Sequence, residues 1–485
     1  MLKMVALSVV FLFAKVASET AAKWANLRFL SDRTIRLRRL IMQSIFSRPF
    51  RLFRQKDDAY YLNLLGNDTE MYASERLSLI PVIVGGISDI IIYVVALYLI
   101  NPWLMLACVV LSLLPLLTSG LFTKVTQNKR EAFSKASEQY TGVLKEGIEG
   151  YEPIRVGCGT AAYMERFISA CENKQKKYSS SAMANTICMQ TLYTTAIFLN
   201  IGCTAVGGWL MLRGVLPLPM LFAAVSYSGN LSNSFTNITE YIITIRSTKK
   251  IVKKLHAECQ TESQPTTIKF DGEKADVVYE KVSFAFDERQ LYKGFSYHFQ
   301  ENGCYAVIGE SGSGKSTLLK LLLKYYDDYA GSIQMAGHDI KTLSEDNIFE
   351  VIGVVDQAPF LFNASLYENI MLFRHDINEN SDEYRKLLKD VNLTELAQRV
   401  GDKPLGDFGD NISGGERQRI SLARTMRRHP RIVVFDEPTT GLDPENASLI
   451  NQYIFNHKNM LRIVIGHNWE NDYLKQFDGV IRVGE

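Results

Sequence analysis

The sequence predicts a two-part protein: an all-α membrane-spanning helical bundle followed by an α/β domain. At 485 residues the chain is longer than a single hydrophobic core normally organises. Long apolar runs fill the first half, whereas short β-rich runs alternate with charged helical segments in the second. We therefore expect a membrane domain over 1–255, a linker over 256–269 and an α/β domain over 270–485.

The first part contains apolar stretches of the roughly 20 residues that a bilayer requires. Four stretches have this length, and a fifth at the start is interrupted by Lys15 and Glu19. Only Asn101 and Pro102 separate the first two of the four, which predicts a tight helical hairpin. The five expected spans are Val5–Trp24, Leu79–Ile100, Trp103–Leu121, Ile187–Leu212 and Met220–Ile245.

The opening stretch has a second interpretation, as a secretory signal. Lys3 precedes a short apolar core, and the small residues Val16-Ala17-Ser18 follow it. A span is favoured because the helical pattern continues without a break into Arg33, Arg36, Arg38 and Arg39, which a cleaved leader would not require.

Charge asymmetry predicts the orientation, because short cytoplasmic connections collect Lys and Arg. Segments 33–56, 124–177 and 246–254 are basic, whereas 101–102 and 213–219 hold a single Arg between them. The α/β domain is therefore expected in the cytoplasm, in a multi-pass protein of the plasma membrane. Five spans place the N-terminus outside, which leads us to expect that a preceding first span is missing from this chain.

The last expected span is polar along its length. Exposing so many polar side chains to hydrocarbon is costly, so one face is expected to line a water-filled pathway. Hydrogen bonding between packed helices is the alternative. The polar residues are Asn230, Ser232, Asn233, Ser234, Thr236, Asn237, Thr239 and Glu240.

Overall charge and cysteine content exclude other classes. A net charge of +2 gives no concentrated basic face, so nucleic acid is not an expected partner. The seven cysteines have neither disulfide-framework nor metal-site spacing, and Cys108, Cys188 and Cys203 lie in apolar runs.

A glycine-rich motif is the strongest local signal in the second part. It follows the β-like run Tyr305–Ile308 and precedes the helical run Leu318–Leu323. Its glycines let backbone N–H groups converge on phosphate oxygens, while Lys315 reaches the terminal phosphates and Ser316 can hold Mg²⁺. The motif is Gly309, Glu310, Ser311, Gly312, Ser313, Gly314, Lys315, Ser316 and Thr317.

Two carboxylates follow a second apolar strand. The run Ile432–Phe435 predicts a buried parallel strand that ends in Asp436 and Glu437. Asp436 is expected to hold Mg²⁺, and Glu437 to orient or deprotonate an attacking water.

A third motif provides a second helix N-terminus aimed at phosphate. Ser413 is a natural N-cap, and Gly414 and Gly415 expose backbone donors ahead of the run Ile420–Met426. In this order the motifs resemble the ATP-binding cassette (ABC) family, and the spans before them resemble its exporter-type permeases. The resemblance implies a P-loop NTPase fold and a signature motif, which includes Ser413 to Glu416, that contacts ATP on a second cassette.

The same resemblance assigns further residues. Phe286 corresponds to the aromatic side chain that stacks on adenine, Gln357 to the glutamine that senses Mg²⁺, Asp443 to the dimer-contacting loop and His467 to the γ-phosphate histidine. Segments 46–53 and 150–157 match the short coupling helices that dock on the cassette in this family. Asp407 matches the acidic loop residue that contacts such a helix. Glu416, Phe286 and Asp407 replace the family's usual Gln, Tyr and Glu.

These observations predict a dimeric half-transporter that hydrolyses ATP to export a peptide, a lipid or an amphipathic small molecule. ATP and Mg²⁺ are the expected cofactors, and a second half, identical or related, and membrane lipid are the expected partners. The alternatives are a non-transporting ATP-gated membrane regulator and an inactive truncated half.

Overall fold

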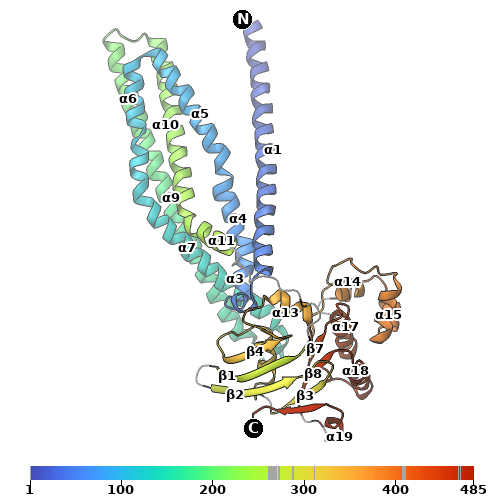
Figure 1. Cartoon of the computed structure of the whole chain (residues 1–485). Coiled ribbons are helices and arrows are strands. Elements are labelled where there is room, and N and C mark those ends of the chain that lie inside the picture. The colour runs from blue at the N-terminus through green and yellow to red at the C-terminus, as the bar shows by residue number, and fades with distance from the viewer. Residues whose placement is uncertain are drawn as a thin grey trace. The chain divides into compact units, whose positions relative to one another are not determined.

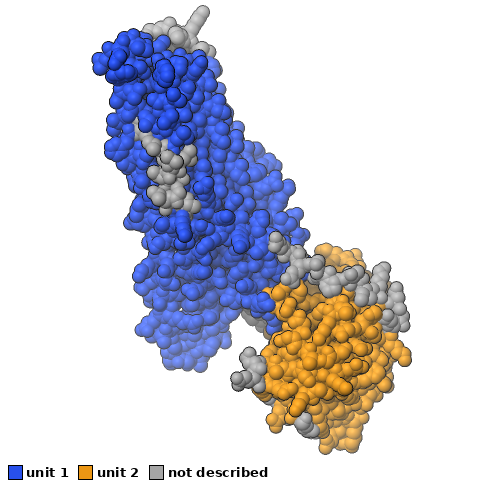
Figure 2. Space-filling view, turned by 60° about the vertical axis from the view of Figure 1, so that its left-hand side comes forward, with its two compact units in different colours: residues 1–48, 53–262 blue, residues 49–52, 263–485 orange. Residues whose placement is uncertain are grey.

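The computed structural model describes residues 2–259, 270, 274–286, 289–310, 312–406, 411–467, 469 and 471–484. The chain divides into two compact units, residues 1–48 with 53–262 and residues 49–52 with 263–485, coloured separately in Figure 2. The short segment Pro49–Leu52 thus belongs with the second unit, although it lies inside the predicted membrane domain. Residues 256–259 of the predicted linker are helical, and its remainder lies outside the described residues.

Long helices dominate the first unit (Figure 1). Expected spans lie inside α1, α5, α9 and α10. The long helices are α1 (Leu2–Phe46), α5 (Leu79–Ile100), α6 (Pro102–Ser112), α7 (Leu114–Glu149), α9 (Thr160–Leu212) and α10 (Leu218–Ser247). The short elements are α2 (Phe50–Phe53), α3 (Asp58–Asn63), η1 (Leu64–Asp68), α4 (Thr69–Tyr72), η2 (Ala73–Leu77), α8 (Tyr151–Val156) and α11 (Lys249–Cys259), where η1 and η2 are π-helical turns.

The expected span Trp103–Leu121 is not one uninterrupted helix. Helix α6 ends at its C-cap Leu113, and α7 begins at Leu114 with Pro115 in its first turn. Proline has no N–H, so at this position it cannot donate to the carbonyl four residues earlier. The prediction overlooked this break because the stretch is apolar throughout.

The predicted hairpin between α5 and α6 is confirmed. Asn101 is extended, with φ −162° and ψ 123°, and its side-chain oxygen accepts the N–H groups of Trp103 and Leu104 at 2.9 and 3.1 Å. Its own N–H donates to Leu97 O at 2.9 Å. One residue therefore ends α5 and caps α6, while Pro102 occupies a first-turn position that needs no donor.

The core of the bundle is formed by α5, α6, α9 and α10. Its buried side chains include Leu97, Leu104, Cys203 and Leu231. Among the described residues, two helical stretches are long and apolar enough to cross a membrane, Asp58–Ile100 and Thr160–Leu212. The expected number of five spans stays a prediction.

The second unit contains two sheets, which confirms the α/β class. The antiparallel sheet has the order β2-β1-β4-β5 and the parallel sheet the order β6-β7-β8-β3-β9. The strands are β1 (Val277–Phe286), β2 (Arg289–Phe299), β3 (Cys304–Ile308), β4 (Ala330–Met335), β5 (His338–Asp339), β6 (Ile352–Val355), β7 (Ile432–Asp436), β8 (Leu461–Gly466) and β9 (Gly479–Arg482). The helices are α12 (Lys315–Leu322), α13 (Glu345–Val351), α14 (Leu366–Met371), α15 (Asp382–Asp390), α16 (Thr394–Val400), α17 (Gly414–Met426), α18 (Pro444–Asn456) and α19 (Asn471–Leu474).

Both faces of the parallel sheet are buried. Along β7, Ile432 and Val434 join one hydrophobic cluster, and Val433 and Phe435 join the other. Successive strand residues point to opposite faces, so an unbroken apolar run is the pattern of a strand covered on both sides. The predicted central strand at 432–435 is confirmed.

The segment Pro49–Leu52 is an integral part of the second unit. The Phe50 ring lies 4.6 Å from that of Tyr325 and 5.2 Å from that of Phe349. The Phe50 N–H donates to both oxygens of Glu345, at 2.9 and 3.2 Å, and Arg51 pairs with Asp327 at 3.5 Å. This packing explains why four residues distant in sequence belong with the second unit.

Glu345 makes the stability of the second unit depend on pH. Burial raises the pKa of Glu345 to about 7, although the Phe50 N–H opposes this. A raised pKa means that the folded state holds the proton more tightly, so this contribution is present below about pH 4.5 and is lost as pH rises through about 7. Thermal unfolding of the purified chain should show Glu345→Gln gaining about 1 kcal/mol relative to the parent between pH 5 and pH 8, after discounting for partial exposure. The matched control is Glu350→Gln, at an exposed position on the same helix, and an equal gain there would contradict the assignment.

Candidate functional site

The glycine-rich loop joins the buried strand β3 to helix α12. Gly309, Gly312 and Gly314 have φ values of 159°, 79° and 107°. At the last two positions this is a conformation that side chains resist, and at Gly309 a Cβ would lie 2.3 Å from Val483 O. The Tyr292 hydroxyl of β2 donates to Gly314 O at 2.5 Å, which ties the antiparallel sheet to the loop. The sequence thus builds a tight loop with backbone N–H groups at a helix N-terminus.

Lys315 lies across this loop. Its ammonium donates to Gly309 O at 2.9 Å and to Glu310 O at 2.8 Å, and the residue is only 6 % exposed. The buried Ser313 hydroxyl lacks a hydrogen-bond partner in the part of the chain that the structure describes. A buried cation and an unsatisfied hydroxyl in one glycine loop fit a phosphate chain, which supplies acceptors for both.

Ser316 and Asp436 form a second part of the site. The Ser316 side chain hydrogen-bonds to Asp436, at the carboxyl end of β7. Burial raises the pKa of Asp436, and the neighbouring Glu437 and Asp356 raise it further. The groups here are a hydroxyl, a half-buried carboxylate and two neighbouring acids. All of them offer oxygen atoms and together they carry excess negative charge, which fits Mg²⁺.

Three residues predicted from separate motifs meet at the sheet edge. Gln357 Nε2 donates to Glu437 Oε2 at 2.8 Å, and His467 Nδ1 lies 3.2 Å from Glu437 Oε1. They follow β6, β7 and β8, which are neighbours in the parallel sheet. Because the carboxyl ends of parallel strands share one edge, the fold brings Gln357, Glu437 and His467 together.

The backbone at Glu437 is strained. Its φ is +47°, a conformation unfavourable for a residue with a Cβ. Its N–H donates to Ile465 O of β8 at 2.9 Å, and the Thr440 hydroxyl donates to Oε2 at 3.2 Å. The backbone bond maintains the strained conformation, and the Thr440 bond positions the carboxylate. Strain of this kind is typical of residues at functional sites.

The signature residues form a capped helix N-terminus. Ser413 is the N-cap of α17, and its hydroxyl accepts the Glu416 N–H at 3.2 Å. The Glu416 carboxylate accepts the Ser413 N–H at 2.9 Å and pairs with Arg399 at 2.9 Å. Burial raises the pKa of Glu416, but the Ser413 and Arg399 donors outweigh it, so the net pKa is lowered. Its carboxylate is therefore engaged in the cap, and Gly414 and Gly415 supply the uncommitted backbone at this helix end.

Asp443 caps the neighbouring helix α18. Its carboxylate accepts the Asn446 N–H at 3.0 Å and the Asn446 Nδ2 at 2.6 Å. Asn446 in turn bonds to Arg419 of α17 and would lie 2.5 Å from a Cβ at Gly415. This close approach leaves no room for a side chain at position 415, which explains the glycine there. It also links the Asp443 loop to the signature helix.

Of the remaining predicted residues, the structure describes Phe286 and Thr317. Phe286 ends β1, is 40 % exposed and makes edge contacts with Phe284 and Tyr326 at 5.0 Å. Its exposed ring is available to an aromatic ligand. Thr317 is buried in the first turn of α12 and donates its N–H to Gly314 O at 2.7 Å. Ser311 and Asp407 lie outside the described residues.

Gln418 is a buried residue beside the site that the motif analysis did not single out. It is 2 % exposed, and its Nε2 donates to Asp356 O at 3.0 Å and to Gln357 O at 3.4 Å. One side chain thus fixes the backbone of the segment that carries Gln357. A buried amide in a signature helix was the available signal, but sequence spacing alone does not show what it contacts.

Comparison with known families agrees with this architecture. The model described as "ABC transporter transmembrane region" matches residues 1–235, and the model "ABC transporter" matches residues 292–440. This chain belongs to the ABC transporter family. It carries one membrane region and one ATP-binding domain, the arrangement of a half-transporter of the exporter type, and it is an integral membrane protein.

Several relatives are about a quarter identical to this chain over the aligned residues. It is 29 % identical over 329 residues to the mitochondrial iron-sulfur clusters transporter ATM1 of Saccharomyces cerevisiae, covering 66 % of this chain and 47 % of the relative. It is 24 % identical to the mitochondrial ATP-dependent permease MDL2 of the same yeast, covering 94 % and 60 %. It is 27 % identical to the ATP-dependent lipid A-core flippase of Francisella novicida, covering 72 % and 61 %. The chain spans about half to three-fifths of the length of these relatives.

A solved structure has the same fold. A bacterial Atm1-family ABC exporter with ATP bound matches with a TM-score of 0.83 at 21 % identity, covering 94 % of this chain and 82 % of that one. The helical region followed by an ATP-binding α/β domain is therefore the exporter fold, as the sequence predicted.

The buried amide of Gln418 is expected to matter for turnover more than for nucleotide binding. Gln418→Leu removes the donor that holds Asp356 and Gln357, so Gln357 loses its position beside Glu437. We expect kcat for ATP to fall about tenfold while nucleotide affinity changes less than about twofold. The measurement is steady-state ATP turnover with equilibrium binding of a fluorescent ATP analogue. Arg417→Leu, on the same helix, is the control, and equal losses in the two variants would contradict the assignment.

Proposed function

We propose that this chain pairs with a second half-transporter to form an ATP-driven exporter, in which the paired cassettes bind and hydrolyse ATP. One observation carries the proposal: Gln357, Glu437 and His467 converge at the edge of the sheet, beside the Ser316–Asp436 pair. A binding-only site needs the phosphate loop but has no use for a carboxylate held by two polar side chains at this position.

Each residue has a distinct role in the proposed reaction. Lys315 and the loop N–H groups bind the phosphates, since they present donors at a helix N-terminus. Glu437 accepts a proton from the attacking water, and Gln357 and His467 hold its carboxylate in place. Ser316 and Asp436 would hold Mg²⁺, with Gln357 beside them, and a bound Mg²⁺ supplies positive charge against the phosphate oxygens.

A second copy would complete each site. Ser413, Gly414 and Gly415 provide a second helix N-terminus, whose partial positive charge favours phosphate. In the proposed dimer this end faces ATP on the partner's phosphate loop, and Asp443 lies at the same interface through its contact with Asn446. An identical partner is sufficient, because one chain contains both halves of such a site.

Helix α10 supports an aqueous pathway through the membrane domain. Its buried hydroxyls bond within the helix, as Thr236 to Ser232 O at 2.9 Å and Thr239 to Phe235 O at 2.7 Å. Asn230 and Asn233 are exposed along the same helix. Two exposed amides on a membrane helix favour a water-filled surface over lipid. A peptide, a lipid or an amphipathic small molecule remains the proposed cargo.

The orientation and location follow from the charge pattern. We place the ATP-binding half on the cytoplasmic side, where the basic connections lie. The plasma membrane is the proposed location, with lipid around the bundle. Because two relatives are named as mitochondrial, fractionation should compare plasma and mitochondrial membranes from the same cells.

ATP turnover by the purified chain in lipid nanodiscs tests the proposed function. Glu437→Gln should lower kcat by about 10² to 10⁴ while retaining ATP binding, because only the proton acceptor is removed. Lys315→Ala should weaken ATP binding at least about tenfold, because phosphate loses a charge-assisted donor. Lys320→Ala, on the same helix as Lys315, is the control for lost charge.

The outcomes separate the proposal from its alternatives. Turnover in the parent that both site variants lose supports a self-sufficient ATPase and an identical partner. ATP binding without turnover, unchanged when a candidate second half is added, would overturn hydrolysis-driven export in favour of an ATP-gated regulator. Absence of ATP binding would indicate an inactive half.

A further inference from the structure

The chain passes between its two units at three places. These are the bonds between Arg48 and Pro49, between Leu52 and Phe53, and between residues 262 and 263. A movement of one unit can pass to the other along the chain at these connections. The contacts around them on the first unit therefore decide which helices such a movement displaces.

Arg48 and Glu258 join two of these connections. Arg48 is the last residue before the first passage, and Glu258 lies near the end of α11, four residues before the third. The Arg48 guanidinium pairs with the Glu258 carboxylate, and its Nη2 donates to Glu258 O at 2.9 Å. The two side chains are 14 % and 10 % exposed, so the pair is largely shielded from water and salt.

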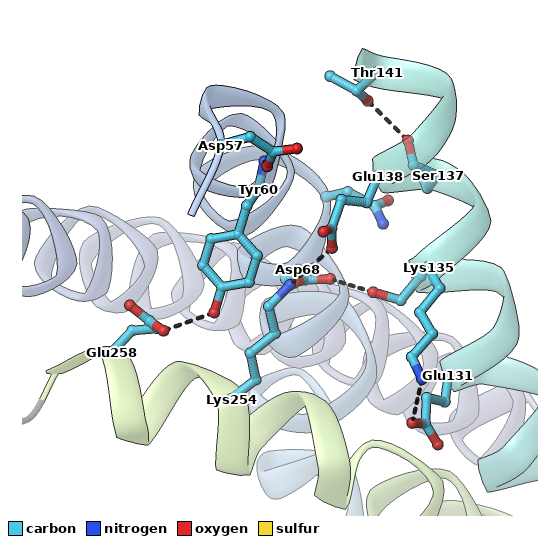
Figure 3. Close-up of polar contacts among 12 residues, drawn as sticks. Asp57, Tyr60, Asp68, Glu131, Lys135, Ser137, Glu138, Thr141, Lys254 and Glu258 are labelled. Carbon is cyan, nitrogen blue, oxygen red and sulfur yellow. Dashed lines mark hydrogen bonds and ion pairs between the residues drawn. The ribbon is translucent and has the colours of Figure 1, made fainter. Parts of the chain in front are cut away.

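Tyr60 completes this contact from helix α3. Its hydroxyl donates to Glu258 Oε1 at 2.6 Å (Figure 3). Arg48 engages the other oxygen, Oε2. Both carboxylate oxygens are thus committed to residues from two other segments.

A second contact anchors the preceding turn of α11. Lys254 Nζ donates to Asp68 Oδ2 at 2.8 Å, and Asp68 is fully buried at the end of the π-helical turn η1. The other Asp68 oxygen accepts the Ser134 hydroxyl of α7 at 3.1 Å. Lys254 also lies 4.3 Å from the centre of the Tyr60 ring (Figure 3). Helix α11 is therefore fixed to α3, η1 and α7 by charge as well as by packing.

The second connection is held by an aromatic pair. Phe53, the first residue back in the first unit, stacks on Tyr61 with ring centres 4.9 Å apart and 12° between planes. The Tyr61 hydroxyl donates to Phe53 O at 3.1 Å. Tyr60 and Tyr61 are adjacent, so one turn of α3 holds both the Glu258 contact and the returning chain.

We propose that Arg48, Glu258 and Tyr60 act as a clamp that couples ATP-driven movement of segment 49–52 to helix α11 and, through it, to the membrane helices. The inference rests on the proposed function. Segment 49–52 follows Arg48 directly and is anchored in the second unit through Phe50 and Glu345. A displacement of that segment pulls on Arg48, whose bonds to Glu258 pass the displacement to α11 instead of letting the chain flex.

The clamp is a positioning device that contains none of the residues of the proposed ATP site. Its loss should separate ATP hydrolysis from movement of the membrane helices, because the catalytic residues all lie in the second unit. Allosteric coupling between sites typically amounts to factors of about 5 to 150. If the contact were only structural, its loss would instead loosen α11 both with and without ATP.

Hydrogen–deuterium exchange of the full chain in lipid nanodiscs distinguishes these roles. The readout is exchange in the connection Arg213–Pro217 between α9 and α10, with and without ATP plus vanadate. In Arg48→Gln and Glu258→Gln, the ATP-dependent change in exchange should fall at least about fivefold, while ATP turnover stays within about twofold of the parent. The exchanged pair Arg48→Glu with Glu258→Arg should restore part of it, because an arginine at 258 re-forms the ion pair but cannot accept the Tyr60 hydroxyl. Arg39→Gln, at an exposed position of α1, is the matched control.

Two further measurements guard against loss of structure. Exchange within α11 without ATP should remain near that of the parent, and Tyr60→Phe, which removes a single hydroxyl, should show the same uncoupling to a smaller degree. A full ATP-dependent change in folded clamp variants would overturn the proposal, as would variants whose α11 is unprotected even without ATP. A parent with neither turnover nor an ATP-dependent change would overturn the proposed function, and the clamp with it.

Discussion

In the parallel ladder of the second unit, Val355 pairs with Phe435 and Phe435 pairs with Val464. This register places the ends of β6, β7 and β8 side by side, and the polar residues that follow them meet in consequence. Ile308 of β3 pairs with Gly466 of β8, which brings the phosphate loop to the same edge. The ATP-binding site therefore depends on backbone hydrogen bonds between buried strands, and its side chains are positioned by that ladder before they contact one another.

The parts that sequence predicted well share a local cause. The phosphate loop, the capped signature helix and the buried β7 each depend on residues adjacent in the chain, since a glycine, a serine cap or an apolar run acts on its own neighbours. The Asn101–Pro102 hairpin is of the same kind. The meeting of Gln357, Glu437 and His467 needed the strand order as well, and the family resemblance supplied it.

The parts that sequence did not predict depend on long-range contacts or on competition between local effects. Pro115 breaks the stretch 103–121, although its apolar character suggested one span. Glu416 belongs to the predicted signature motif, but the engagement of its carboxylate by its own cap and by Arg399 was not predicted. Arg48 and Glu258 are 210 positions apart. Arg48 lies in segment 46–53, which the family resemblance matches to a coupling helix, but its partner Glu258 lies in no motif. The aromatic partners of Phe50 in the second unit could not be identified from spacing either.

The backbone conformation of Glu437 also limits which sequences this position can accept. A left-handed φ of +47° is tolerated by Gly, Asn and Asp and resisted by β-branched side chains. A lineage that lost hydrolysis at this residue would thus pass most readily to Gly, Asn or Asp, and rarely to Val, Ile or Thr. The residue type at this position in related halves would then depend on the backbone conformation of the loop as well as on whether hydrolysis was kept.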